Sequence, residues 1–237
     1  MRRGGSGEVP LIREIPEAVC CPCSAGRMPS AGQLAGQSAW DLVRYALTES
    51  PLKVAVGIAT LNALSDLLMK KNGLPGYRRL IGADALDVVD NIRHDDEVAL
   101  VGAFVPFIKK LKGTVKQLRV VEKNPQALKG NELEFYRPAE QAGEVLNRAD
   151  VVVISGSAMV HHSLDPLLGF CRAARQVIVA GPTASMYPGP LFDRGVTVLG
   201  GMAVHNADEL LRVVSEGGSG YFFGRWAEKV TIIKPQL

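Results

Sequence analysis

Short apolar segments recur from residue 98 onward, and each runs into a glycine with small or hydroxyl-bearing neighbours. The first, over residues 98–104, follows the charged stretch 94–97, and the later ones are 151–154, 177–180 and 196–199. A strand buried on both faces shows a continuous apolar run, as parallel strands covered by helices do. The pattern therefore predicts a parallel sheet whose strands end in glycine.

A helix and a second strand follow the first strand directly. Residues 105–113 carry apolar residues at helical spacing, with lysines before Gly113, as at a helix C-terminus. The next strand, over residues 117–121, closes with Glu122, which lies 20 residues after Gly102. In nucleotide-binding sheets this is the place of the acid that holds a ribose.

The first 80 residues show a different pattern. Residues 1–36 are rich in Gly, Pro, Ser and Arg and have no sustained periodicity. A later helix over residues 52–71 is apolar nearly all round, which predicts burial on several sides. Within it, Thr60 and Asn62 either bond the local backbone or face a ligand crevice. We expect a smaller domain over residues 1–80 and a sheet domain over residues 83–237.

Further elements complete the predicted alternation. Pro138 suits the first turn of a helix that continues through Leu146. Another helix is expected after His162, and one over residues 208–215. The apolar residues 230–233 predict a last strand, placed at an edge of the sheet.

Composition and charge exclude several classes of protein. The 237 residues are 47% hydrophobic and 22% charged, and the net charge of +3 is too small to favour nucleic acid or a membrane surface as a partner. We find no apolar run of membrane-spanning length and no signal peptide. The four cysteines do not resemble a secreted disulfide framework, so we expect a cytoplasmic protein.

Glycine and hydroxyl-bearing residues gather at the predicted strand ends. In open parallel sheets, ligands bind outside the carboxyl ends of the strands, where glycines let the backbone approach a ligand. The plainer interpretation is that each glycine makes a tight strand-to-helix turn. Four such endings together favour a crevice lined by Gly102, Ser155, Gly156, Ser157, Gly181, Pro182 and Thr183.

The usual nucleotide motifs are missing. Gly102 is followed by Phe104 and Pro106 rather than by the further glycines of a dinucleotide fingerprint, and these side chains would obstruct the phosphates. Neither a phosphate loop nor a nucleophile elbow is present. Glu122 alone is compatible with the ribose of a nucleoside cofactor such as S-adenosylmethionine.

Two groups of residues offer other chemistry. Cys20, Cys21 and Cys23 are thiols, which soft metals prefer, but adjacent cysteines do not easily face one ion and no second pair completes a zinc site. His161 and His162 follow a strand end, where one of them could act as a base or a metal ligand. The alternative interpretations are plain thiols and surface histidines.

From about Trp40 onward the chain resembles the bacterial and archaeal family of heavy-metal chelation domains, whose function is undetermined. The stretches that carry the resemblance are residues 57–63, 98–106, 149–157, 181–183, 191–196 and 214–218. The resemblance implies an α/β protein in which a small α+β domain, similar to the N-terminal part of enolase, precedes a domain with a Rossmann-like parallel sheet. It also implies a site in the cleft between them, and so favours Thr60 and Asn62 as residues that face the cleft. The first 36 residues are short for the strands of such a small domain, so we expect that domain to be trimmed or irregular.

The leading hypothesis is a protein of metal homeostasis that binds a heavy or transition metal ion, or a small metal-bearing or organic ligand, in this cleft. Glu122 would anchor the ligand, and Ser157 and Thr183 would donate hydrogen bonds. The alternative is an enzyme that uses a nucleoside cofactor at Glu122 with His161 or His162 as base; a third is an interaction protein with a vestigial crevice. The apolar helix is compatible with a homodimer contact. The predicted lining is Asn62, Gly102, Phe104, Glu122, Ser155, Gly156, Ser157, Gly181, Pro182 and Thr183.

Overall fold

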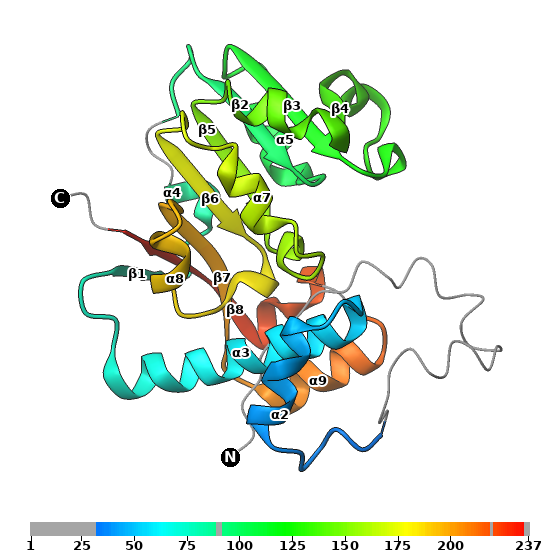
Figure 1. Cartoon of the computed structure of the whole chain (residues 1–237), viewed down its shortest axis with the longest axis vertical. Coiled ribbons are helices and arrows are strands. Elements are labelled where there is room, and N and C mark those ends of the chain that lie inside the picture. Colours follow the sequence, from blue (N-terminus) through cyan, green and yellow to red (C-terminus); the bar gives the residue numbers. More distant parts are fainter. Residues whose placement is uncertain (1–31, 89–91, 219, 235–237) are drawn as a thin grey trace.

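The computed structural model describes residues 32–88, 92–218 and 220–234. Within these residues one mixed sheet of eight strands runs through the molecule, in the order β1-β8-β7-β6-β5-β2-β3-β4 (Figure 1). Neighbouring strands are parallel except in the pairs β1–β8 and β7–β8, which are antiparallel. The strands are β1 (Arg78–Ile81), β2 (Glu97–Val101), β3 (Gln117–Glu122), β4 (Tyr136–Pro138), β5 (Val151–Ser155), β6 (Gln176–Ala180), β7 (Val198–Val204) and β8 (Ala227–Ile233).

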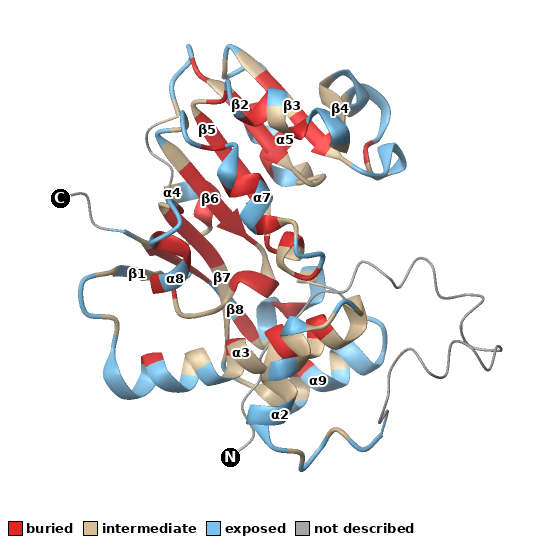
Figure 2. Ribbon diagram, viewed as in Figure 1, coloured by how far each residue is buried: buried red, intermediate tan, exposed pale blue. Residues whose placement is uncertain are grey.

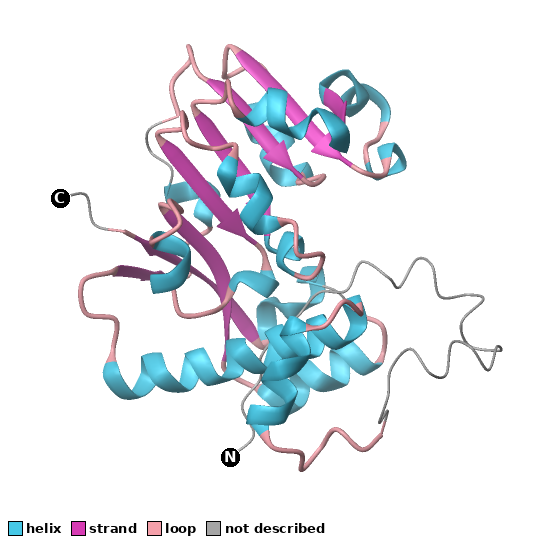
Figure 3. Ribbon diagram, viewed as in Figure 1, coloured by secondary structure: helices cyan, strands magenta, loops and turns pink. Residues whose placement is uncertain are grey.

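Helices connect the strands and cover both faces of the sheet (Figure 3). The α-helices are α2 (Ala39–Val43), α3 (Pro51–Asn72), α4 (Ala85–Val88), α5 (Val105–Leu111), α6 (Ala142–Leu146), α7 (Leu164–Gly169), α8 (Gly189–Phe192) and α9 (Ala207–Ser215). Short 3₁₀ helices are η2 (Arg44–Leu47), η3 (Pro125–Ala127), η4 (Gly130–Phe135), η5 (Ala139–Gln141), η6 (Gly156–Met159), η7 (Pro182–Ala184) and η8 (Gly220–Arg225).

The order in which the chain adds the six parallel strands to the sheet reverses once. The chain first builds outward from β2 to β3 and β4, then returns to the other side of β2 with β5, β6 and β7. Doubly wound sheets of this order bind ligands at the carboxyl edge next to the reversal, here between β2 and β5.

The central strands are buried along most of their length (Figure 2), and their alternating side chains divide the core into two clusters. On one face Leu100 and Val153 pack in the cluster that holds Phe107 and Ile108 of α5. On the other face Val152 belongs to a cluster formed with α6, α7 and α8. Because both faces are buried, these strands show the continuous apolar runs from which the sequence predicted them.

The predicted sheet is confirmed as a mostly parallel one, with corrections at its ends. The strand predicted over residues 196–199 begins at Val198 and continues through Gly200 and Gly201 to Val204. Its pairing with antiparallel β8 carries it past the glycines, so this strand does not end in glycine.

The last strand does not lie at an edge, because β1 pairs with its outer side. The short segment Arg78–Ile81 has no long apolar run, and for that reason the sequence did not indicate it as a strand. Pro138 likewise ends β4 instead of starting a helix, and α6 begins only at Ala142.

Helix α3 is the longest helix of the described chain and packs beside α2. It lies close to strands β7 and β8 of the sheet (Figure 1). Val54, Ala55 and Ile58 are buried against Val160. Three leucines of its C-terminal half are 39–44% exposed, so burial is less complete than predicted: Leu64, Leu67 and Leu68.

By length and composition alone, α3 is long and apolar enough to cross a membrane. The expectation that no apolar run reaches this length was therefore wrong for α3. One such helix is weak evidence for a membrane span, because core helices of soluble proteins meet the same criteria.

Candidate functional site

The predicted strand-end residues lie side by side. A Cβ placed on Gly102, whose φ is +105°, would lie 3.1 Å from the Cβ of Ser155. The hydroxyls of Ser155 and Ser157 are 2.8 Å apart and share a hydrogen bond. A Cβ on Gly156 would lie 3.3 Å from the Cβ of Thr183. We call Gly102, Ser155, Gly156, Ser157 and Thr183 the strand-end cluster.

Gly181 and Pro182 stand next to this cluster, at the turn from β6 into η7. Gly181 has a φ of +124°, and its N–H donates to the carbonyl of Gly200. The carbonyl of Pro182 accepts from the hydroxyl of Ser185 at 2.7 Å. These contacts fit the plainer interpretation of a glycine in a tight turn. A ligand-binding role for the two residues remains a prediction.

Glu122 lies at the end of β3 and holds the neighbouring loops. Its Oε2 accepts a hydrogen bond from the backbone N–H of Ala103 at 3.0 Å, and its Oε1 accepts one from Asn124 at 3.0 Å. Next to Ala103, Phe104 turns its ring toward Phe107 at 5.2 Å between centroids. Both carboxylate oxygens of Glu122 therefore support the backbone of this chain.

The two polar residues singled out in the long helix behave differently. Asn62 is 2% exposed, and its Nδ2 donates to the carbonyl of Thr183 at 3.0 Å, so it joins α3 to the strand-end cluster. Thr60 instead donates to the carbonyl of Val56, one turn earlier in the helix, at 2.8 Å. Thr60 therefore follows the first of the two interpretations, in which its hydroxyl bonds the local backbone.

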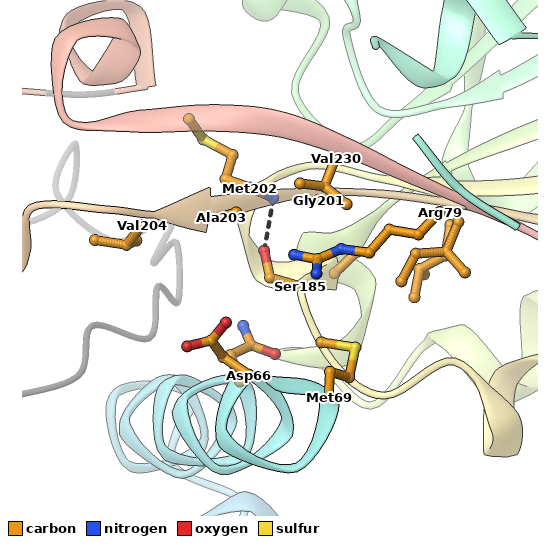
Figure 4. A pocket seen from close by; sticks show the side chains of 13 residues that line it. Asp66, Met69, Arg79, Ser185, Gly201, Met202, Ala203, Val204 and Val230 are labelled. Atoms are coloured by element: carbon orange, nitrogen blue, oxygen red, sulfur yellow. Dashed lines mark hydrogen bonds between the residues drawn. The ribbon is translucent and has the colours of Figure 1, made fainter. Parts of the chain in front are cut away.

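A pocket lies between α3 and the sheet, beyond the strand-end cluster (Figure 4). Of the predicted lining residues, it contains Asn62. We call it the α3 pocket. Its lining is Asn62, Asp66, Met69, Arg79, Ala184, Ser185, Leu199, Gly201, Met202, Ala203, Val204, Val230 and Ile232.

The register of the sheet explains why these residues share one pocket. Arg79 of β1 is paired with Ile232 of β8, and Ile232 with Leu199 of β7, so the three side chains lie on the same face of the sheet. Gly201, on the same face of β7, lets Ser185 approach, because a Cβ there would lie 2.8 Å from the Cα of Ser185.

The polar groups of the α3 pocket come from opposite walls. Arg79 extends from the sheet and Asp66 from α3, as Figure 4 shows. The Nε of Arg79 is buried without a hydrogen-bond partner in the described structure. One oxygen of Asp66 pairs with Lys70 at 2.7 Å. Sequence reasoning missed Arg79 and Asp66, because β1 was not recognised and the helix appeared apolar all round.

The described residues do not fit a bare metal ion. They contain no group of three His, Cys, Asp or Glu residues that could hold one. Burial raises the pKa of the Cys171 thiol to about 11, and its Sγ lies 3.2 Å from the carbonyl of Leu167, so it is a packed thiol. Cys20, Cys21 and Cys23 lie outside the described residues.

Three of the histidines lie at the surface of the described chain. His161 and His162 are exposed, and the Nε2 of His162 lies 2.8 Å from the carbonyl of Thr48. His205 is also exposed and bonds the carbonyl of Arg225 at 3.1 Å. His162 and His205 thus each contact a backbone carbonyl.

One curated protein is similar in sequence to most of this chain. A protein of Methanocaldococcus jannaschii, "Uncharacterized protein MJ0500", is 26% identical over 181 residues, which are 75% of this chain and 64% of that protein. This chain thus spans less than two thirds of that relative.

Two crystal structures show the same fold, both of proteins of unknown function. The one from Pyrococcus horikoshii has a TM-score of 0.71 at 20% identity and covers 85% of this chain and 77% of its own. The one from Desulfitobacterium hafniense has a TM-score of 0.71 at 24% identity, with 87% and 79% covered.

Family models place the chain more firmly. A model described as "Putative heavy-metal chelation" matches residues 84–233, which is more than half of the chain, and a second model with the same description matches residues 9–65. The two crystal structures are described as members of the first of these families. The resemblance seen in the sequence is confirmed: the chain belongs to the family of heavy-metal chelation domains.

Proposed function

We propose that this protein is a small-ligand-binding protein of metal homeostasis that takes up a metal-bearing or organic molecule where α3 meets the sheet. The observation that carries the proposal is the α3 pocket, in which Asp66 and Arg79 reach into a space that they share with apolar side chains of β7 and β8. Concave, mostly apolar sites with a few polar groups are typical of small-molecule binding. The family description supplies the link to heavy metals.

The proposed arrangement keeps the two-part organisation expected from the family. Residues 1–80 would form the enolase-like small domain, whose last residues enter the sheet as β1, and residues 83–237 the Rossmann-like domain, with the ligand between α3 and the sheet. Two observations support it: Asn62 binds the carbonyl of Thr183 across the two parts, and the order of the parallel strands is that of doubly wound sheets. We place the protein in the cytoplasm and propose no nucleic-acid or membrane partner.

An enzyme that uses a nucleoside cofactor gains no support from the contacts. The two carboxylate oxygens of Glu122 already accept backbone N–H groups, and His162 bonds the carbonyl of Thr48.

The first experiment measures what the protein retains. Untagged protein from metal-supplemented cells is denatured, its metal content is measured by elemental mass spectrometry, and released small molecules are analysed by mass spectrometry. We expect a near-stoichiometric small molecule, with or without a metal. Recovery of neither, together with no thermal stabilisation by metals or metal chelates, would contradict the proposal.

A pair of variants locates the ligand. Ala203 lines the α3 pocket, so Ala203→Leu should fill it and reduce ligand recovery several-fold. Ala127 lies in η3, outside the pocket lining, and Ala127→Leu should leave recovery unchanged. Equal recovery from both variants would place the ligand elsewhere.

A further inference from the structure

Two opposite charges line the α3 pocket without pairing with each other. Arg79 and Asp66 extend from facing walls into the same space (Figure 4), and no ion pair joins them. The Arg79 side chain forms no hydrogen bond or ion pair within the described structure, and its Nε is buried. The Oδ1 of Asp66 accepts no hydrogen bond from a described residue, since Lys70 contacts Oδ2.

An unsatisfied guanidinium nitrogen at a pocket wall points to a ligand acceptor. Nearly all buried polar groups in proteins have a hydrogen-bond partner, and an exception requires an explanation. The planar fork of arginine matches the two oxygens of a carboxylate, to which it donates parallel hydrogen bonds. Arg79 is therefore suited to a carboxylate that enters the pocket.

Asp66, on the facing wall of the α3 pocket, favours a positively charged group at the other end of such a ligand. Asp66 would repel a second negative charge and attract an ammonium group. This argues against a phosphate, which carries more negative charge and would meet one arginine and one aspartate here. The rest of the lining includes apolar side chains, among them those of Met69, Leu199 and Ile232.

We propose that the α3 pocket binds a zwitterionic amino-carboxylate with a small apolar side chain, its carboxylate on Arg79 and its ammonium toward Asp66. The inference rests on the proposed function and specifies its ligand class. A heavy metal would then reach this pocket as a complex with an amino-carboxylate. A bare cation would meet the charge of Arg79 and find no group of three donor residues among the described residues.

The test compares three probes that differ by one charged group. Isothermal calorimetry on the full chain uses L-methionine, its amine-free analogue 4-(methylthio)butanoate and its carboxylate-free analogue 3-(methylthio)propylamine. We expect L-methionine to bind at least tenfold more tightly than either analogue, because the amine-free analogue makes no contact with Oδ1 of Asp66 and the carboxylate-free analogue makes none with Arg79. Ni²⁺ alone should not compete with L-methionine.

Neighbouring arginines supply a matched control. Arg79→Met should weaken L-methionine binding about tenfold or more, and Arg79→Lys should restore part of it, since lysine keeps the charge without the fork. Arg78 precedes Arg79 on the same strand and is exposed, so Arg78→Met should bind as the unmodified protein does.

Three outcomes would overturn the inference. These are no saturable binding of any probe, equal binding by Arg79→Met, and stronger binding of the amine than of L-methionine. If the molecule that copurifies lacks a carboxylate, the proposed function stands and the ligand class fails. If Ni²⁺ alone fills the pocket, the ligand class also fails, and the proposed function is contradicted as well, because a bare ion is then the ligand. If nothing copurifies and no probe binds, both fail.

Discussion

The strand-end cluster and the α3 pocket lie next to each other but differ in how their polar groups are satisfied. In the strand-end cluster Ser155 and Ser157 bond each other, and the nearby Glu122 accepts two backbone N–H groups. In the α3 pocket the Nε of Arg79 is buried without a described partner. The first region holds the fold together with its own hydrogen bonds, whereas the second retains a donor for a ligand.

The glycines strengthen this contrast. A Cβ on Gly102 would lie 3.1 Å from the Cβ of Ser155, and a Cβ on Gly156 would lie 3.1 Å from the backbone N of Ala184. Their missing side chains let chain segments pack together at the strand ends. Residue types typical of ligand crevices are therefore also those of tight packing, and only the contacts distinguish the two uses.

The largest expected effect tests whether the strand-end cluster is packed shut. Gly102→Ala should destabilise the protein by about 3 kcal/mol, because it combines a strained φ with a contact against Ser155. Gly113 also has a positive φ but open space around it, so Gly113→Ala should cost about 1 kcal/mol. Urea unfolding measures both. Equal losses would mean that the cluster leaves room for a ligand.

Arg175 pairs with a buried carboxylate elsewhere in the fold, so its substitution can be compared with that of Arg79. Asp96 is 3% exposed and accepts hydrogen bonds from Arg175 at 2.7 Å and from the backbone N–H of Arg93 at 2.6 Å. Arg175→Met should destabilise the protein by about 2 kcal/mol, since it leaves a buried carboxylate short of a partner. Arg172 is exposed, and Arg172→Met should have no measurable effect.

The same pair predicts a pH dependence. Burial alone would raise the pKa of Asp96, but the hydrogen bonds from Arg175 and from the Arg93 backbone lower it below its usual value. Its contribution to stability is therefore complete above about pH 4 and is lost as the pH falls through the lowered pKa. The difference in unfolding free energy between Arg175→Met and the unmodified protein should shrink below pH 4. A constant difference would contradict this assignment.

Arg79→Met should have the opposite sign in the ligand-free protein. The substitution removes a buried donor that has no described partner, and methionine suits the apolar lining of the α3 pocket. We expect a gain of about 1 kcal/mol, measured by urea unfolding of protein freed of small molecules by refolding. Destabilisation comparable to that of Arg175→Met would show that Arg79 supports the fold, and the contrast between the two regions would disappear.

Much of the sheet could be predicted from the sequence, because buried parallel strands have a distinctive pattern. β3, β5 and β6 appear as apolar runs at the predicted places, whereas the run predicted over residues 98–104 ends as strand β2 at Val101. The edge strand β1 has the sequence Arg-Arg-Leu-Ile, and its strand conformation depends on pairing with β8, which no local pattern reveals. Because the sequence analysis did not identify β1, it also placed β8 wrongly at the edge of the sheet.

The candidate site was only partly predictable. Asn62 was indicated as a polar residue in an apolar helix, and the structure places it at both the strand-end cluster and the α3 pocket. Arg79 and Asp66 are single charged residues without a motif, and they lie on different elements, β1 and α3. Only the strand register and the position of α3 bring them to one pocket, so local reasoning had no signal for them.

The smallest expected effect separates the two regions most directly. Ser157→Ala removes the hydroxyl that the sequence analysis assigned to a ligand, but in the structure this hydroxyl bonds Ser155 at 2.8 Å. The partly exposed pair contributes little, so we expect a loss of about 0.5 kcal/mol in stability and L-methionine affinity within twofold of the unmodified protein. Calorimetry beside Arg79→Met provides the comparison. A loss of affinity greater than fivefold for Ser157→Ala would mean that the ligand extends from the α3 pocket past Asn62 to the strand ends, as the sequence predicted. The reason is that a hydroxyl whose only role is in the fold should not affect binding in a neighbouring pocket.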